Sequence, residues 1–121
     1  MHELSRAKAI LHAAAQLATS QRAGAAEEIV AVNVALNPLA GADGEELREC
    51  FALAARGTPF AGVELRLTEM RLQGKCAACG RPVEIAGPET RCPCGQDDLR
   101  LPVEDDWKLT GLERRGGQEE P

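Results

Sequence analysis

The spacing of apolar residues near the beginning of the chain predicts an α-helix. Apolar positions recur there at steps of three and four: Leu4, Ala7, Leu11, Ala14 and Ala18, with Ile10 and Leu17 beside them. Polar side chains take the opposite face. We interpret His12 on that face as a solvated histidine, with an accessory metal or partner contact as the alternative. Alanine favours the helix, and Gly24 is expected to end it.

Two later segments alternate apolar and polar residues with the period of two that is typical of a half-buried strand. In residues 30–36, valine or leucine occupies every second position. Asn37-Pro38 is expected to end this strand, because proline has no N–H for a sheet ladder. The same alternation begins again at Val63, and this second strand is expected to run to about Leu72.

A second helix is predicted between these two strands. Asp43 and Glu46 have the spacing of a capping box, and the apolar stripe that follows consists of Leu47, Cys50, Phe51 and Ala54. Gly57-Thr58-Pro59 is expected to end the helix. Since Cys50 lies on the apolar stripe, we interpret it as a small buried hydrophobe, with a reactive thiol as the alternative.

The last residues predict one short strand and a tail. Trp107 and Leu109 alternate with Lys108 and Thr110, as in a strand. Residues 114–121 are polar and contain two adjacent glycines, so we expect a flexible, frayed tail there.

Composition limits the core and narrows the classes of function. Of 121 residues 44% are apolar, but 20 of these are alanine, and the aromatic residues are Phe51, Phe60 and Trp107. A metal or a partner is therefore an expected supplement to hydrophobic burial. A net charge of −5 without a dense basic run argues against a nucleic-acid partner. Charged residues near the start leave no room for a secretory signal, and no apolar stretch is long enough for a membrane span.

The cysteines give the strongest chemical signal. Five cysteines in a chain expected to be cytoplasmic favour metal binding or catalysis over disulfides. Residues 75–101 contain four of them, in a C-x-x-C pair and, after a gap of twelve residues, a C-x-C pair: Cys76, Cys79, Cys92 and Cys94. Two short cysteine turns that face each other can supply four thiolates to a structural zinc ion. The apolar residues on both sides of the second pair predict the short strands of a zinc ribbon: Val83, Ile85, Leu99 and Leu101.

Alternatives to this zinc site remain open from the sequence. The cysteines could be unrelated buried thiols, and Cys76 with Cys79 could be a redox pair, although the βαβ setting of such a pair is absent. The second pair is one residue shorter than usual. Cys94 could therefore point away, leaving the fourth position to Asp97, Asp98 or a water molecule.

A second candidate metal site is the amino terminus, Met1-His2-Glu3. A terminal histidine is usually frayed. A residue as large as His2, however, should prevent removal of Met1 and leave its α-amine free. This amine, the amide nitrogen of His2 and the imidazole can form fused chelate rings around one ion. Such nitrogen-rich, nearly planar sites suit Ni(II) or Cu(II) better than Mg²⁺ or Ca²⁺.

Taken together, these motifs resemble a known family, the hydrogenase maturation nickel metallochaperones (HypA/HybF). The resemblance extends from Met1 to about Glu113. It rests on the Met-His-Glu-Leu-Ser start, the order of helices and strands, the C-x-x-C pair, and the second pair in its Cys92-Pro-Cys94-Gly95 setting. The family usually has glycine where Asn37 stands and a C-P-x-C second pair, so this chain differs at both places.

The resemblance implies an α+β protein with two lobes. Residues 1–73 and 102–113 would form a small sheet with two helices, which holds nickel through His2, Glu3 and the Met1 amine. Residues 74–101 would form the inserted zinc-ribbon lobe, with a structural zinc on the four cysteines. Asp43 falls near an acidic residue that some relatives place close to nickel, but its capping position is the better explanation for it.

The resemblance also implies a function. The expected role is delivery of nickel to NiFe-hydrogenase large-subunit precursors, in concert with a nickel-handling maturation GTPase, and in some organisms to urease. The protein is expected to be a cytoplasmic monomer or weak homodimer without nucleic-acid or membrane partners. It is expected not to be an enzyme, since no nucleophile–base pair or phosphate-binding glycine loop is present. The alternative is a zinc-ribbon adaptor that docks proteins or nucleic acid and carries no nickel.

Overall fold

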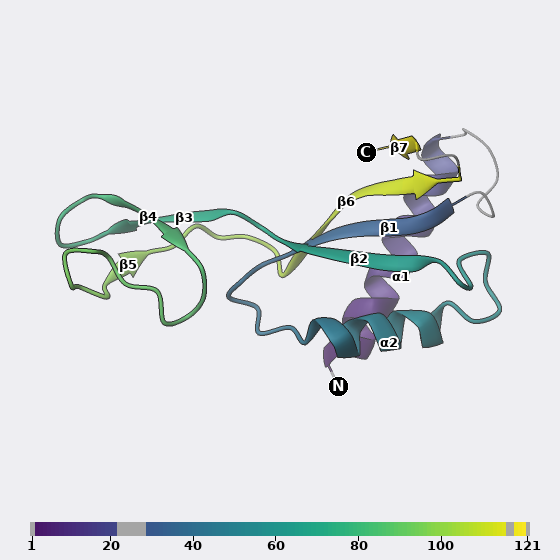
Figure 1. Cartoon of the computed structure of the whole chain (residues 1–121), viewed down its shortest axis with the longest axis horizontal. Coiled ribbons are helices and arrows are strands. Elements are labelled where there is room, and N and C mark those ends of the chain that lie inside the picture. The colour runs from purple at the N-terminus through teal and green to yellow at the C-terminus, as the bar shows by residue number, and fades with distance from the viewer. Residues whose placement is uncertain (1, 22–28, 116–117, 121) are drawn as a thin grey trace.

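The computed structural model describes residues 2–21, 29–115 and 118–120, without the side chains of residues 2, 21 and 118–120. Two helices and seven strands follow in the order α1 (His2–Gln21), β1 (Ile29–Leu36), α2 (Gly44–Ala54), β2 (Glu64–Glu69), β3 (Leu72–Cys76), β4 (Pro82–Ile85), β5 (Leu99–Arg100), β6 (Trp107–Arg114) and β7 (Gln118–Glu120). They form an elongated molecule with two parts (Figure 1). The helices and a four-stranded sheet make up the larger lobe, and a three-stranded sheet with its loops makes up the smaller one.

The larger sheet has the strand order β2-β1-β6-β7. The central strand β1 pairs in parallel with β2 and antiparallel with β6. A parallel pair needs a crossover connection, and α2 provides it between β1 and β2. Asp43 caps α2 as expected, since its Oδ1 accepts a hydrogen bond of 3.2 Å from the Glu46 amide.

The main core lies between this sheet and the two helices, which cover the same face of it (Figure 1). Neighbouring strands place Leu65, Val32 and Leu112 in one row across the sheet. From the helices, Ile10, Leu47 and Phe51 pack onto this row, and each is at most 1% exposed. The predicted stripe of α2 therefore faces the core.

Truncation of Phe51 is expected to reveal the weight of this small core. Phe51→Ala should lower the free energy of unfolding by about 3–5 kcal/mol, because it leaves a cavity that small neighbouring side chains cannot fill. Leu53→Ala on the same helix is the control, since Leu53 is 55% exposed and should cost less than about 1 kcal/mol. Urea unfolding of the two variants measures the difference, and equal losses would contradict this assignment of the core.

Helix α1 is rotated slightly from its expected orientation. Its buried residues are Glu3, Ala7, Ile10 and Ala14, whereas Leu4 is 37% exposed. The buried stripe is thus centred one position earlier than the apolar pattern indicates, because the polar contacts of Glu3 bring that side chain inward. Helix α1 runs to Gln21, and Gly24, its expected stop, lies outside the described residues.

Two expectations about the strands are wrong. The strand expected to run from Val63 to about Leu72 is two strands, since β2 ends at Glu69 and β3 begins at Leu72. The break occurs because the two strands have different partners: β2 pairs with β1, and β3 pairs with β4 and β5. The tail is not wholly frayed either, because β7 pairs with β6 and satisfies an edge that would otherwise be unpaired.

The remaining elements follow the sequence analysis closely. β4 contains Val83 and Ile85 and β5 contains Leu99, as expected, but Leu101 lies beyond the end of β5 and is 47% exposed. β6 is longer than the short strand expected around Trp107. In β1, a register shift next to Val30 leaves that residue 37% exposed, although the alternating pattern places it with the buried valines. In the part of the chain that the structure describes, neither helix is both long and apolar enough to cross a membrane.

Candidate functional site

The four ribbon cysteines come from two tight turns at one end of the smaller lobe. β3 ends at Cys76, and the chain turns back so that the Gly80 amide donates to the Cys76 carbonyl over 2.8 Å. The second turn closes in the same way, with the Gly95 amide 2.9 Å from the Cys92 carbonyl. Both glycines have positive φ angles, 77° and 97°, which only glycine adopts without strain.

These turns bring all four sulfur atoms together. The Sγ atoms of Cys76, Cys79, Cys92 and Cys94 lie within 4.8 Å of one another. The Sγ of Cys94 is 3.7 Å from that of Cys76, and the Sγ atoms of Cys79 and Cys92 are 3.6 Å apart. Zinc–thiolate bonds of about 2.3 Å in a tetrahedron require sulfurs about 3.8 Å apart, so this arrangement fits Zn²⁺. It does not fit disulfides, in which the sulfurs are about 2.05 Å apart.

Cys94 belongs to this cluster despite the short C-x-C spacing. The carboxylates of Asp97 and Asp98, which were open as substitutes, are not part of it in the described chain. Two of the four cysteines also belong to the smaller lobe's own core, since Cys76 and Cys92 are buried with Val83, and the partly buried Leu99 packs against them. So small a core indicates that the bound metal contributes much of the lobe's folding free energy.

The surroundings of Cys76 and Cys92 shift the pKa values of their thiols in opposite directions. Backbone hydrogen bonding from Cys79 lowers the pKa of the Cys76 thiol to about 7. A backbone hydrogen bond from Cys94 also lowers the pKa of Cys92. Burial and the neighbouring sulfurs outweigh it, however, and raise that pKa to about 12. A divalent ion removes this conflict, because its charge stabilises all four thiolates together.

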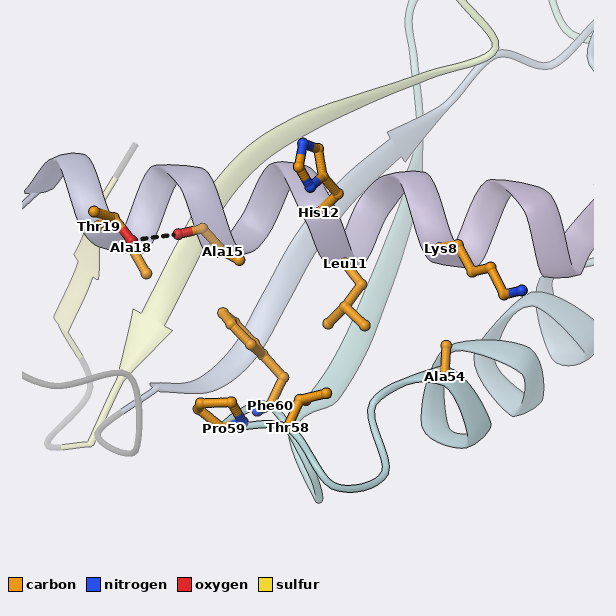
Figure 2. A pocket seen from close by; sticks show the side chains of 10 residues that line it. All are labelled: Lys8, Leu11, His12, Ala15, Ala18, Thr19, Ala54, Thr58, Pro59 and Phe60. Carbon is orange, nitrogen blue, oxygen red and sulfur yellow. Dashed lines mark hydrogen bonds between the residues drawn. The ribbon is translucent and has the colours of Figure 1, made fainter.

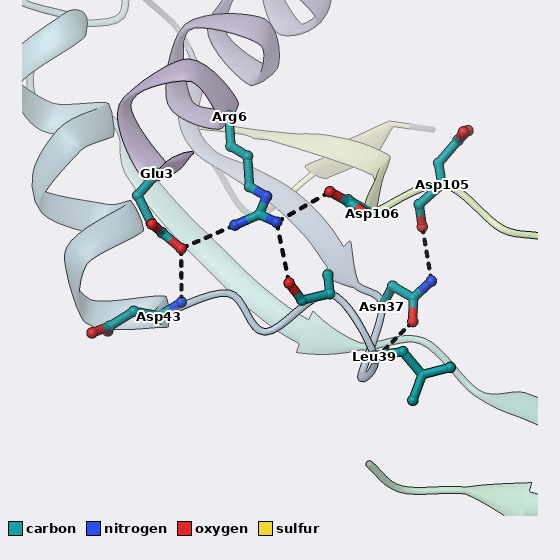
Figure 3. A network of polar contacts seen from close by, with 8 residues as sticks. Glu3, Arg6, Asn37, Leu39, Asp43, Asp105 and Asp106 are labelled. Atoms are coloured by element: carbon teal, nitrogen blue, oxygen red, sulfur yellow. Dashed lines mark hydrogen bonds and ion pairs between the residues drawn. The ribbon is translucent and has the colours of Figure 1, made fainter. Parts of the chain in front are cut away.

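The amino-terminal candidates lie in the larger lobe, where α1 begins beside α2 (Figure 1). Met1 is outside the described residues, and of His2 only the backbone, as the first residue of α1, is described. Glu3 is 7% exposed, and its Oε2 accepts two hydrogen bonds of 3.0 Å, from the Asp43 amide and from Nη1 of Arg6 (Figure 3). The Asp43 hydrogen bond is the main cause that lowers the pKa of the Glu3 carboxyl below its usual value, although burial opposes it. The backbone amide of Glu3 and the charge of Arg6 act in the same direction as Asp43.

Arg6 is a residue whose role the sequence analysis missed. Besides Glu3, its guanidinium donates to the Ala40 carbonyl over 3.2 Å and to Oδ2 of Asp106 over 3.1 Å (Figure 3). Arg6 thus ties the first turn of α1 to the loop before α2 and to the segment that leads into β6. The sequence does contain one signal of this role. Glu3 and Arg6 are three positions apart, and this spacing places two side chains next to each other on a helix.

Two other candidate residues stand apart from these groups. His12 is exposed and lines a mostly apolar groove of about 630 Å³ between α1 and the residues around Phe60 (Figure 2). Among the described residues it joins no cluster of metal-ligating side chains, in agreement with a solvated histidine. Cys50 is half-buried and packs against the main core, as a small hydrophobe would.

Comparison with known proteins decides the family. A family model described as hydrogenase/urease nickel incorporation, metallochaperone, hypA matches residues 1–113. The chain belongs to the HypA family. Hydrogenase maturation factor HypA of Prosthecochloris aestuarii is 33% identical over 102 residues, which cover 84% of this chain and 88% of that protein. HypA of Chloroflexus aggregans is 42% identical over 98 residues, which cover 79% and 83%.

The fold agrees with a solved HypA structure. The solution structure of the Ni metallochaperone HypA from Helicobacter pylori matches with a TM-score of 0.63 and 15% identity, over 93% of this chain and 97% of that one. The resemblance to HypA and the α+β fold with two helices are therefore confirmed. Membership in a metallochaperone family also agrees with the expectation that the chain is not an enzyme.

Proposed function

We propose that this HypA protein binds Ni(II) at its amino terminus and delivers it to the precursor of a NiFe-hydrogenase large subunit. The observation that carries the proposal is the family match over residues 1–113, which includes both Met1-His2-Glu3 and the four cysteines. The ligands would be the Met1 amine, the His2 imidazole and amide, and Glu3. The zinc ligands would be Cys76, Cys79, Cys92 and Cys94.

The two sites suit opposite tasks. Zinc on four converging thiolates, two of them buried, is suited to permanent retention. Nickel at the amino terminus would have few protein ligands and open positions that a receiving protein could fill. The first amides of a helix have no partner within the helix, so the amide of His2 at the start of α1 would be available to the metal.

We also propose the partners and the division of labour between the lobes. A nickel-handling maturation GTPase would act with this protein, urease would be a second client in some organisms, and the protein would work in the cytoplasm as a monomer or weak homodimer. Residues 1–73 and 102–113 would handle nickel, and residues 74–101 would hold zinc. β3 begins at Leu72, so the zinc lobe would already begin within the last residues of the 1–73 segment.

A short extension tests the proposal against a zinc-ribbon adaptor that carries no nickel. A Gly-Ser dipeptide placed before Met1 converts the α-amine into an amide and should abolish tight nickel binding by zinc-loaded, untagged protein. The same dipeptide placed after Pro121 is the control and should change nothing. Calorimetric titration with Ni(II) measures both proteins. An adaptor would show no tight nickel site in any of the three forms, and a site insensitive to the extension would exclude the amine as a ligand.

A further inference from the structure

We infer that Arg6 weakens nickel binding by holding the Glu3 carboxylate away from the metal, and that it thereby sets how readily nickel is released. The inference rests on the proposed function, in which Glu3 is one of the nickel ligands. Arg6, which is not a ligand, would then control the affinity for nickel. A carrier must keep this affinity low enough to pass the metal on.

The Glu3 carboxylate is already engaged. Its Oε2 accepts charge-assisted hydrogen bonds of 3.0 Å from both Asp43 N and Arg6 Nη1, and its side chain is only 9% exposed. A carboxylate that turns from these donors toward a metal leaves a guanidinium and an amide without this acceptor. Hydrogen bonds to charged groups are among the stronger ones in proteins, so nickel binding through Glu3 must offset their loss.

The Arg6 guanidinium would stay in place if the Glu3 carboxylate turned toward the metal. Two of its acceptors, the Ala40 carbonyl and Oδ2 of Asp106, belong to other segments of the chain and keep the guanidinium in place. The arginine side chain is 15% exposed, so solvent and salt screen its charge only partly. A fixed positive charge next to a ligand of a divalent cation disfavours that cation in every geometry of Glu3.

The direction of the effect separates this inference from simple structural support. If Arg6 only positioned Glu3 for the metal, for example through the second carboxylate oxygen Oε1, its removal would weaken nickel binding. If it competes with the metal, its removal strengthens binding. Arg6→Gln is therefore the informative change, because it removes the charge and retains some hydrogen-bonding capacity.

The experiment compares zinc-loaded wild type with Arg6→Gln in competition for nickel with a chromogenic chelator. We expect Arg6→Gln to bind about tenfold more tightly, equivalent to ~1.4 kcal/mol, and to release nickel to excess chelator more slowly. Lys8→Gln is the matched control. It removes the same charge from an exposed position on the same helix, and it should change affinity much less. Arg6→Lys, which keeps the charge but not the planar fork, should tighten binding by a smaller factor and serves if Arg6→Gln does not fold.

A double substitution tests whether the effect passes through Glu3. In a Glu3→Gln background, Arg6→Gln should tighten nickel binding much less than it does with Glu3 present, because only the direct repulsion between the guanidinium and the metal is left to remove. Three results would each overturn the inference and leave the proposed function intact. Arg6→Gln could bind nickel no more tightly than wild type, Lys8→Gln could gain as much nickel affinity as Arg6→Gln, or Arg6→Gln could gain its full nickel affinity in the Glu3→Gln background. Absence of nickel binding by wild type would overturn both.

Discussion

Replacement of Cys76 or Cys79 by alanine is expected to release zinc completely and to unfold the ribbon lobe. The four sulfurs converge within 4.8 Å, and Cys76 and Cys92 are two of the three buried residues in the lobe's small core, alongside Val83. Zinc contributes roughly 10–16 kcal/mol to the folding of small thiolate-rich domains, which no other contact in residues 75–101 can replace. Metal analysis after dialysis should find one zinc per wild-type chain and none in these variants.

Hydrogen exchange locates the loss and distinguishes it from general damage. Residues 75–101 should lose protection in Cys76→Ala and Cys79→Ala, while α1, α2 and β1 keep theirs, because the main core is formed by other residues. Cys50→Ala is the matched control, since the thiol of Cys50 lies outside the cluster and its removal should leave zinc in place. Purified protein without zinc, or variants that exchange like wild type, would contradict the ribbon assignment.

Cys94 provides a sharper form of the same test. The short C-x-C spacing left its role open, but its Sγ lies 3.7 Å from that of Cys76, as in a tetrahedral site. Cys94→Ala should therefore release as much zinc as Cys79→Ala. The comparison is fair because Cys79 and Cys94 are both exposed. Retention of zinc in Cys94→Ala alone would mean that water or another group replaces this ligand.

The parts of the fold that sequence could predict are those determined by local chemistry. Asp43 and Glu46 predicted the start of α2, because a capping hydrogen bond joins residues three apart. The cysteine turns were predictable for the same reason, since each pair and its glycine form a unit of a few residues. The family resemblance then joined these local signals in the correct order.

The parts that escaped prediction depend on partners far away in the sequence. Whether the chain after Glu69 continues in one sheet or enters another is decided by β4 and β5, which follow later. The pairing of β7 depends on the edge that β6 offers. The contacts of Arg6 escaped prediction, because two of its acceptors, Ala40 and Asp106, are 34 and 100 residues away. Glu3 was expected only as a nickel ligand, and its contact with Asp43 spans 40 residues.

His2→Ala is expected to abolish tight nickel binding while zinc content and fold remain unchanged. The imidazole is the anchor that lets nickel displace the proton of the neighbouring amide. Its loss leaves an amine, a weak amide donor and the Glu3 carboxylate, which Asp43 and Arg6 already engage. His2 is the first residue of α1, and its truncation should cost well under ~1 kcal/mol of stability. His12→Ala is the matched control, because it removes the other histidine from an exposed position on the same helix.

Protons should imitate the His2→Ala substitution. An unperturbed histidine titrates near pH ~6.5 and an α-amine near ~7.7–8.0, and both must lose a proton before they bind nickel. Nickel affinity should therefore fall steadily from pH 8 to pH 6 in wild type and in His12→Ala, whereas zinc stays bound over this range. Calorimetry on zinc-loaded, untagged proteins at both pH values measures the change. Equal nickel affinity in wild type and His2→Ala would exclude the amino terminus as the nickel site, because His2 carries the only side-chain nitrogen donor within the first three residues.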